Sequence, residues 1–431
     1  ATDNAEFWLQ GSAIFPEQPK GFTQLQLNTS EQTKGPEAGV LSALWVDLYR
    51  QQQTTLLTEA SIAGMNASVS PSFGIQMTFS GFTDKQPELI KRSLEALRIE
   101  PSEEEFIQAV DRFTRGLENS RFGFPVRQLF PAIRRLTQTG AFNQEDLLQA
   151  ANAATLEALS GHIEQQLSTA YVRGYRFGNY SEEDVQSLAD LIARVLPSRS
   201  GDTYTRAATY APQPGSTLVY QENLPVEDLG MAYLFAAPKA SIENVAKGEL
   251  LAAHLSNRAF NQLRTEEQLG YAAGGFATQL GDHPMVGFYI QTPVKAPIAM
   301  LERFDDYRAE FASDLEALEQ AEFESIKAGV LTDLTQPPKN LGEEAGPFLI
   351  DWNRERYNFD TRTRLIAAVE QVTLDAVRDY YAETVMTEAA SRVLVQLKGT
   401  AFADEPFAEI EGAQIVEDVA AFHQSMPVQP R

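Results

Sequence analysis

Residues 260–271 read Phe-Asn-Gln-Leu-Arg-Thr-Glu-Glu-Gln-Leu-Gly-Tyr, and this stretch organises the second half of a 431-residue chain. It reads as the end of an amphipathic helix that runs into a turn containing a glycine, Gly270. The turn aims two polar side chains, Arg264 and Tyr271. Arg264 offers five N–H donors in a fixed fork, and Tyr271 offers one phenolic donor on a rigid ring. Such groups can hold the backbone of an extended peptide without reading its side chains.

The same residues also have a purely structural interpretation. Arg264 could pair with Glu266 or Glu267, and Tyr271 could fill the core. On physical grounds alone this interpretation is the stronger of the two. Three glycines that follow the helix permit a close backbone approach under either interpretation: Gly270, Gly274 and Gly275.

A similar order of elements occurs twice in the chain, offset by about 210 residues. Each copy contains a strand, a helix, a Thr-Glu turn, a glycine, a strand pair and a later closing strand. The first copy has strand 22–28, helix 39–52, Thr58-Glu59, Gly64, strand 73–82 and closing strand 171–177. The second has strand 230–235, helix 244–263, Thr265-Glu266, Gly270, strand 286–292 and closing strand 392–397. This pattern favours a duplication.

The boundary between the copies is predicted in the turn-rich segment 197–214. A chain of this length exceeds what one hydrophobic core supports, whereas about 200 residues are enough for one. We therefore expect an α+β protein with two homologous domains, residues 1–205 and 206–431. Each should be a mixed, mostly antiparallel sheet packed with helices.

Composition excludes several classes of protein. A net charge of −24 argues against a surface that follows nucleic-acid phosphates. No apolar run approaches the roughly 18 residues that span a bilayer. The absence of cysteine excludes disulfides and thiolate metal sites, and fits a periplasmic or a cytosolic protein equally. Because the first residues carry neither an initiator Met nor a signal pattern, we expect a processed product or a fragment.

The histidines do not form a zinc-peptidase site, which needs two of them four residues apart on one helical face. The chain has only His162, His254, His283 and His423. His162 lies near a glutamate, but Gln166 stands where a second ligand is needed, so we expect an exposed helical histidine. We expect His254 to be packed or hydrogen-bonded and His283 to lie in a hairpin-tip loop. The sequence predicts no metal ligand and no catalytic residue.

Residues 260–271 resemble the Phe-x-x-Leu-Arg-Thr-x-Glu-Gln-Leu-Gly-Tyr signature in the C-terminal half of the insulysin and pitrilysin zinc peptidases. Residues 415–422, followed by Pro427, are similar to that family's terminal Ile-x-x-Asp-x-x-x-Phe and proline pattern. The resemblance covers essentially the whole chain. One departure is Glu266, where relatives often carry a basic residue, so binding of acidic peptides should be weaker.

The resemblance implies that the chain is the third and fourth domains of a four-domain peptidase. Zn²⁺ and the catalytic His-x-x-Glu-His would lie in an N-terminal half, part of the same polypeptide or a separate subunit. The substrates would be unfolded peptides, held by Arg264 and Tyr271 near the scissile bond. This chain would form the chamber wall, bind no cofactor and be inactive alone, and a periplasmic location is favoured.

Two other hypotheses stay open at this stage. The chain could be a stand-alone non-catalytic subunit or scaffold that partners a separate zinc peptidase subunit. It could also be an unrelated hydrolase that uses serine or carboxylate chemistry, although no nucleophile motif accompanies the few histidines.

Overall fold

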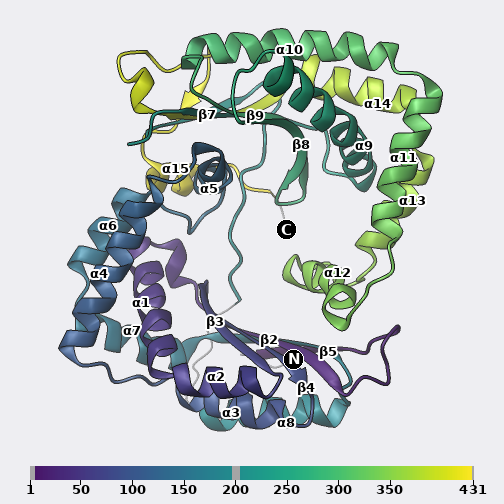
Figure 1. The fold of residues 1–431 in the computed structure, drawn as a ribbon. Coiled ribbons are helices and arrows are strands. Elements are labelled where there is room, and N and C mark those ends of the chain that lie inside the picture. Colours follow the sequence, from purple (N-terminus) through teal and green to yellow (C-terminus); the bar gives the residue numbers. More distant parts are fainter. Residues whose placement is uncertain (1–4, 197–203, 430–431) are drawn as a thin grey trace. The chain divides into compact units, whose positions relative to one another are not determined.

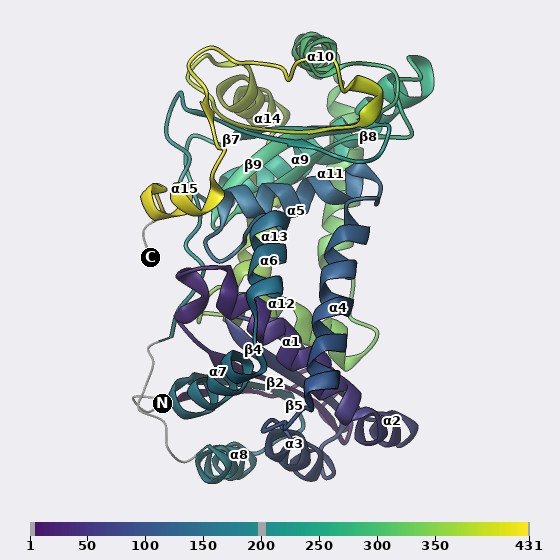
Figure 2. The same cartoon turned by 90° about the vertical axis from the view of Figure 1, so that its left-hand side faces the viewer.

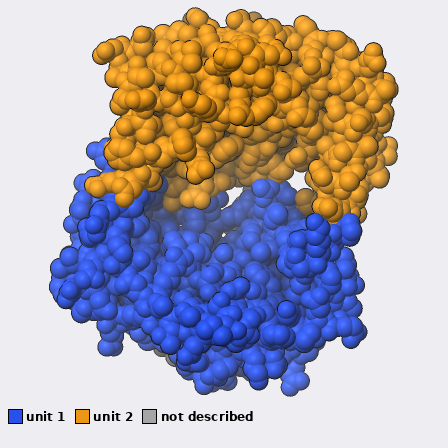
Figure 3. Space-filling view, viewed as in Figure 1, with its two compact units in different colours: residues 1–117, 142–207, 337–359 blue, residues 118–141, 208–336, 360–431 orange. Residues whose placement is uncertain are grey.

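The computed structural model describes residues 5–196 and 204–429 (Figure 1). They form two compact units, each made of three segments that are not contiguous in the sequence (Figure 3). Unit 1 comprises residues 1–117, 142–207 and 337–359, and unit 2 comprises residues 118–141, 208–336 and 360–431. The predicted boundary between two domains at residues 205 and 206 therefore stays a prediction. Residues 197–203 of the predicted linker lie outside the described residues.

Unit 1 is built on a five-stranded sheet in the order β1-β5-β2-β4-β3. The pair β1/β5 is parallel, whereas β5/β2, β2/β4 and β4/β3 are antiparallel. The bounds of the strands are β1 Ala5–Gln10, β2 Lys20–Asn28, β3 Asn66–Ser72, β4 Gly74–Phe82 and β5 Tyr171–Gly178.

Helices cover both faces of this sheet. Its main core joins one face to α1, α3, α6, α7 and α8, and a smaller cluster packs β5 against α12 on the other. Because side chains alternate along a strand, Val172 and Tyr175 of β5 serve different cores. The helices that contribute to unit 1 are α1 Pro36–Gln52, α2 Thr54–Ile62, α3 Gln86–Glu95, α4 Glu103–Ser120, α6 Gln144–Ala153, α7 Leu156–Thr169, α8 Glu182–Val195 and α12 Leu341–Asn353.

Unit 2 contains a six-stranded sheet in the order β11-β6-β10-β7-β9-β8. Its core on one side includes α9, α10 and α14, and a second core on the other side includes α5 and α15. Figure 2 shows α10 and α5 on opposite sides of this sheet. The strands are β6 Thr217–Asn223, β7 Leu229–Ala236, β8 Ala272–Leu280, β9 His283–Thr292, β10 Ser391–Lys398 and β11 Gln414–Ile415, and the helices are α5 Pro125–Thr137, α9 Ile242–Ala259, α10 Pro297–Ala317, α11 Gln320–Thr335, α13 Thr361–Gln371, α14 Leu374–Tyr381 and α15 Val419–Ser425.

The predicted fold class is confirmed, because each unit is a mixed sheet packed with helices. The strand order of unit 1 also recurs in unit 2 as β6-β10-β7-β9-β8, with β11 added at the edge. The parallel pair is in the same place in both sheets. Shared topology of this kind supports the duplication that the sequence pattern indicates.

The prediction of an exposed His162 is wrong. Its side chain is buried, and Nε2 lies 2.9 Å from the hydroxyl of Ser42 on α1. Burial lowers the pKa of His162 to about 4, against a small opposing effect of Glu31. The local sequence alternates polar and apolar residues too weakly to show which face of α7 packs on α1.

No helix among residues 5–196 and 204–429 is long and apolar enough to cross a membrane.

Candidate functional site

The predicted site lies where α9 ends. Ser241 caps the start of α9 by accepting a hydrogen bond from the Asn244 N–H, at 3.2 Å. After Ala259 the α-helix widens into a π-helix, Phe260–Glu266, so the predicted helix 244–263 changes type before it ends. The Glu267 N–H donates to the Gln262 carbonyl, five residues back. Single π turns of this kind are rare and recur at functional sites.

The Arg264 side chain projects from this π-helix into solvent. Its guanidinium lies over the Phe260 ring, 4.5 Å from the ring centre, one helical turn away. Within the described part of the chain, Arg264 forms no ion pair with Glu266 or Glu267. The guanidinium is therefore positioned by an aromatic ring, and its N–H donors stay accessible.

Tyr271 is also accessible, because 77% of its surface is exposed. The chain reaches it through Gln268, whose φ of 55° is left-handed, and through Gly270. A Cβ on Gly270 would lie 1.8 Å from the backbone oxygen of Gln291 on β9, so only glycine fits there. The structural interpretation that placed Tyr271 in the core is wrong.

Two further glycines serve packing inside unit 2. A Cβ on Gly275 would lie 2.2 Å from the Leu255 side chain, so this glycine lets α9 approach β8 closely. A Cβ on Gly274 would lie 2.9 Å from the Tyr289 ring of the neighbouring strand. The close backbone approach that these two glycines permit is therefore to side chains of the protein itself.

Arg303, which sequence reasoning missed, anchors the turn from α10. Its Nε donates to Glu267 Oε2 at 2.8 Å, and one Nη donates to Glu267 Oε1 at 2.5 Å and to Glu310 Oε2 at 2.9 Å. The hydrogen bonds from Arg303 lower the pKa of Glu267. Because Glu267 is held in this way, it does not neutralise Arg264. No local signal identifies Arg303, since it lies in another helix.

The histidines lie apart from one another and contact different partners. His254 Nε2 lies 2.9 Å from Asp314, as expected of a hydrogen-bonded histidine. His283 begins β9 just after the hairpin turn, and its Nε2 lies 2.6 Å from the Ala237 carbonyl. His423 contacts the Arg135 carbonyl. No group of three or more His, Asp or Glu suited to a metal ion occurs among the described residues.

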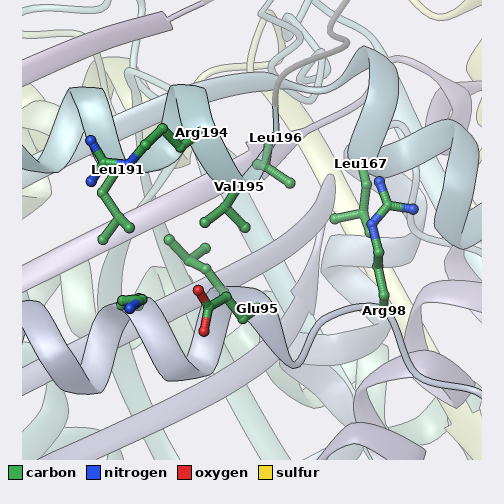
Figure 4. Close-up of a pocket in the computed structure, with 9 residues that line it drawn as sticks. Glu95, Arg98, Leu167, Leu191, Arg194, Val195 and Leu196 are labelled. Carbon is green, nitrogen blue, oxygen red and sulfur yellow. The ribbon is translucent and has the colours of Figure 1, made fainter.

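Unit 1 contains a separate pocket of about 480 Å³ between α3, α7 and α8 (Figure 4). Leu191 and Val195 point from α8 toward α3, and Glu95 lies on the α3 side. Its charged lining also includes Lys91, Arg98 and Arg194. This pocket combines apolar and basic groups, and it contains none of the predicted site residues.

The C-terminal tail packs along unit 2. Residues Gln414–Ile415 form β11 and pair with β6 in parallel. Asp418 caps α15 by accepting a hydrogen bond from the Ala421 N–H, and Phe422 is buried beside Tyr210. Residues 415–422, which resemble the family's terminal pattern, therefore pack against unit 2 and have a structural role.

Two family descriptions match different parts of the chain. Residues 1–150 match the "Middle or third domain of peptidase_M16". Residues 250–349, which include the π-helix, Arg264 and Tyr271, match the "PQQ synthase PqqF-like, C-terminal lobe domain 4".

Curated relatives align along nearly the whole chain. Protease 3 of Escherichia coli (strain K12) is 25% identical over 97% of this chain and 44% of its own length. The A-factor-processing enzyme of Saccharomyces cerevisiae is 24% identical over 96% of this chain and 42% of its own. The human insulin-degrading enzyme is 22% identical over 82% and 35%. The chain therefore spans less than half the length of these relatives.

Solved structures share the fold. The crystal structure of pitrilysin superposes with a TM-score of 0.93 at 24% identity, covering all of this chain and 46% of that one. A peptidase M16 inactive domain from Pseudomonas fluorescens gives a TM-score of 0.67 at 13% identity, covering 95% of this chain and 98% of that one.

Proposed function

The chain belongs to the insulysin and pitrilysin (M16) peptidase family and corresponds to its C-terminal half, and from this premise we propose its role in peptide hydrolysis. In this proposal the chain is a non-catalytic half that forms a wall of the substrate chamber. Its partner is an N-terminal half that carries the Zn²⁺, in the same polypeptide or as a separate subunit. Arg264 and Tyr271 hold the backbone of an unfolded peptide near the scissile bond.

The observation that carries this proposal is the accessibility of both donors. Arg264 is exposed and lacks an ion pair in the described part of the chain, and Tyr271 is 77% exposed. The π-helix and Gly270 fix the backbone between them. A guanidinium and a phenol can donate to peptide carbonyls, which every unfolded peptide offers. Orienting a substrate in this way can contribute several kcal/mol to lowering a barrier.

The test combines this chain with the N-terminal half and follows cleavage of a quenched, unstructured peptide. We expect cleavage only in the mixture, and we expect zinc to be bound by the N-terminal half and not by this chain alone. Arg264→Ala and Tyr271→Phe should each lower turnover by about tenfold to 100-fold and leave the zinc content unchanged, because they remove donors and not ligands.

Arg364→Ala on α13 is the matched control, since it removes an exposed arginine of the same unit that lies 3.9 Å from Asp360. Turnover should then match the wild type. If both Arg264→Ala and Tyr271→Phe also retain wild-type turnover, the proposed role of the two residues fails. Chelator-sensitive cleavage by the purified chain alone would overturn the non-catalytic assignment.

The alternative, a stand-alone subunit or scaffold, differs in how the two halves are encoded. An open reading frame that continues upstream of Ala1 supports one polypeptide, and a separate start codon with a neighbouring peptidase gene supports a subunit.

A further inference from the structure

A second pocket lies beside the π-helix in unit 2 and contains none of the donors assigned above. Its volume is about 140 Å³, the space of four to five water molecules at about 30 Å³ each. It opens between the end of α9, the π-helix and α10. The lining residues are Arg258, Asn261, Gln262, Glu266, Tyr307, Glu310, Phe311 and Asp314.

The pocket carries an excess of negative charge. Asp314 pairs with Arg258 at 3.1 Å, which leaves this pair neutral. Arg303 lies next to the pocket and is shared between Glu310 and Glu267. Glu266 is exposed, and its carboxylate has no hydrogen-bond or ion-pair partner among residues 5–196 and 204–429. The acids therefore outnumber the arginines at this site.

Tyr307 adds an independent sign that the pocket is built for a ligand. Its side chain is 1% exposed, yet its hydroxyl has no hydrogen-bond partner in the described structure. Tyr307 is one of the residues that line the pocket, together with Arg258, Glu310 and Asp314. An unpaired buried hydroxyl is costly, and a ligand group with N–H donors would satisfy its oxygen.

We propose that this pocket is a subsite for an organic cation of a bound peptide, either a basic side chain or the N-terminal ammonium. This inference rests on the proposed peptide-binding function and deepens it. A guanidinium or ammonium group fits the volume, donates to the Glu266 and Glu310 carboxylates and satisfies the Tyr307 hydroxyl. Gln262 and Glu266 lie on the same π-helix as Arg264, so a peptide held by Arg264 has this pocket within reach.

The first experiment uses small probes in place of a peptide, so that binding in the pocket is measured separately from binding of a peptide backbone by Arg264 and Tyr271. Binding of N-acetyl-arginine amide to the full chain is compared with that of N-acetyl-citrulline amide, which has the same shape and no charge, by ligand-observed NMR. Glycine amide supplies an α-ammonium and separates that source from a side-chain cation. We expect a charged probe to bind at least about fivefold more tightly than the citrulline probe, and the preference to fall as salt is added.

Substitutions then locate the binding. Glu266→Gln should weaken binding of the charged probe about threefold to fivefold and leave the citrulline probe unaffected. Tyr307→Phe should weaken binding of both probes, because the ureido group of citrulline also carries N–H donors. Glu302→Gln on α10 is the matched control, because it removes an exposed acid of the same helix that does not line the pocket. Equal binding of charged and neutral probes by the wild type, or an unchanged affinity in Glu266→Gln, would overturn the subsite.

A pair of unstructured peptides that differ only by arginine or citrulline separates this inference from the proposed function. If both peptides bind equally well to wild type and to Glu266→Gln, the peptide-binding function stands and the subsite fails. If neither peptide binds while the charged small probe still does, the function fails and the cation pocket stands. Tighter binding of the arginine peptide, lost in Glu266→Gln, supports both.

Discussion

The helix-to-strand connections of the two units differ in the type and the exposure of their side chains. In unit 2, Arg264 precedes the Thr-Glu pair and Tyr271 follows the glycine, and both side chains are exposed. In unit 1, Thr58-Glu59 lies inside α2, so the predicted turn at this pair is wrong, and the chain leaves the helix only after Ile62. The corresponding neighbours of Thr58-Glu59 and Gly64 are the half-buried Leu57 and the buried Met65. One topology thus carries accessible polar donors in one unit and apolar packing in the other.

This difference shows that the duplicated fold alone does not define the site. Strand order and connection are shared, so the topology supplies only a turn between a helix and an edge hairpin. The candidate function depends on which side chains stand on that turn and on what fixes the backbone beneath them.

The two turn glycines should respond differently to alanine. Gly270→Ala places a Cβ 1.8 Å from the Gln291 oxygen, so we expect a loss of about 3 kcal/mol or more in the unfolding free energy of unit 2. Gly64→Ala meets only a side-chain atom of Phe82 at 3.7 Å, but has a φ of +72°, and should cost unit 1 about 1 kcal/mol.

Separate signals distinguish the units in these experiments. The three tryptophans, Trp8, Trp45 and Trp352, all belong to unit 1, so their fluorescence follows its unfolding in urea. Amide hydrogen exchange of α9 and β8 follows unit 2. If Gly64→Ala destabilises its unit more than Gly270→Ala does, the close approach of Gly270 to the Gln291 backbone does not explain the difference between the two glycines.

Unit 1 should lose stability in mild acid because of His162. Its folded pKa, about 4, lies below the usual value of 6.5, so between these values the unfolded state binds more protons. The unfolding free energy should therefore fall as the pH drops from about 6.5 toward 4, by at most about 3 kcal/mol. Tryptophan-detected urea curves at about pH 7 and about pH 5 measure the slope, which His162→Gln should reduce. An unchanged slope in this variant would refute a neutral buried His162.

Truncating the residue after each glycine tests the contrast directly. Met65 is 6% exposed, so Met65→Ala should destabilise unit 1 by about 2 to 3 kcal/mol through loss of buried contacts. Tyr271→Ala should change the stability of unit 2 by less than about 0.5 kcal/mol. Urea curves for unit 1 and hydrogen exchange for unit 2 report both values. A large loss in Tyr271→Ala would mean that its ring packs in solution and is not free for a peptide.

The smallest effect should come from the ion pair beneath the unit 2 turn. The pKa of Glu267 is lowered by Arg303, so its contribution is present above the usual value of 4.5 and is lost as the pH falls below it. Glu267→Gln should cost about 1 kcal/mol at neutral pH, because this pair is partly exposed. Hydrogen exchange around residues 260–271 should show the difference shrinking toward acid pH, and a constant difference would contradict the ion-pair explanation.

Much of the fold was predictable because periodicity is a local property. The alternation in residues 22–28 and the helical pattern in residues 39–52 correctly indicated β2 and α1. The helix that carries the motif was correct in position but not in type, since no local pattern distinguishes an α turn from the π turn after Ala259. The placement of α12 in unit 1 was not predictable, because it depends on contacts with the distant strand β5.

The sequence by itself determined the α+β class, the repeat, the lack of a paired-histidine zinc motif and the two side chains that name the candidate site. Those features follow from local spacing and residue chemistry. Only the tertiary structure decided that Arg303 holds Glu267, that Tyr271 stands in solvent and that His162 is buried against Ser42. Each of these outcomes depends on residues from separate elements meeting in space, and on which face of a helix the rest of the chain covers.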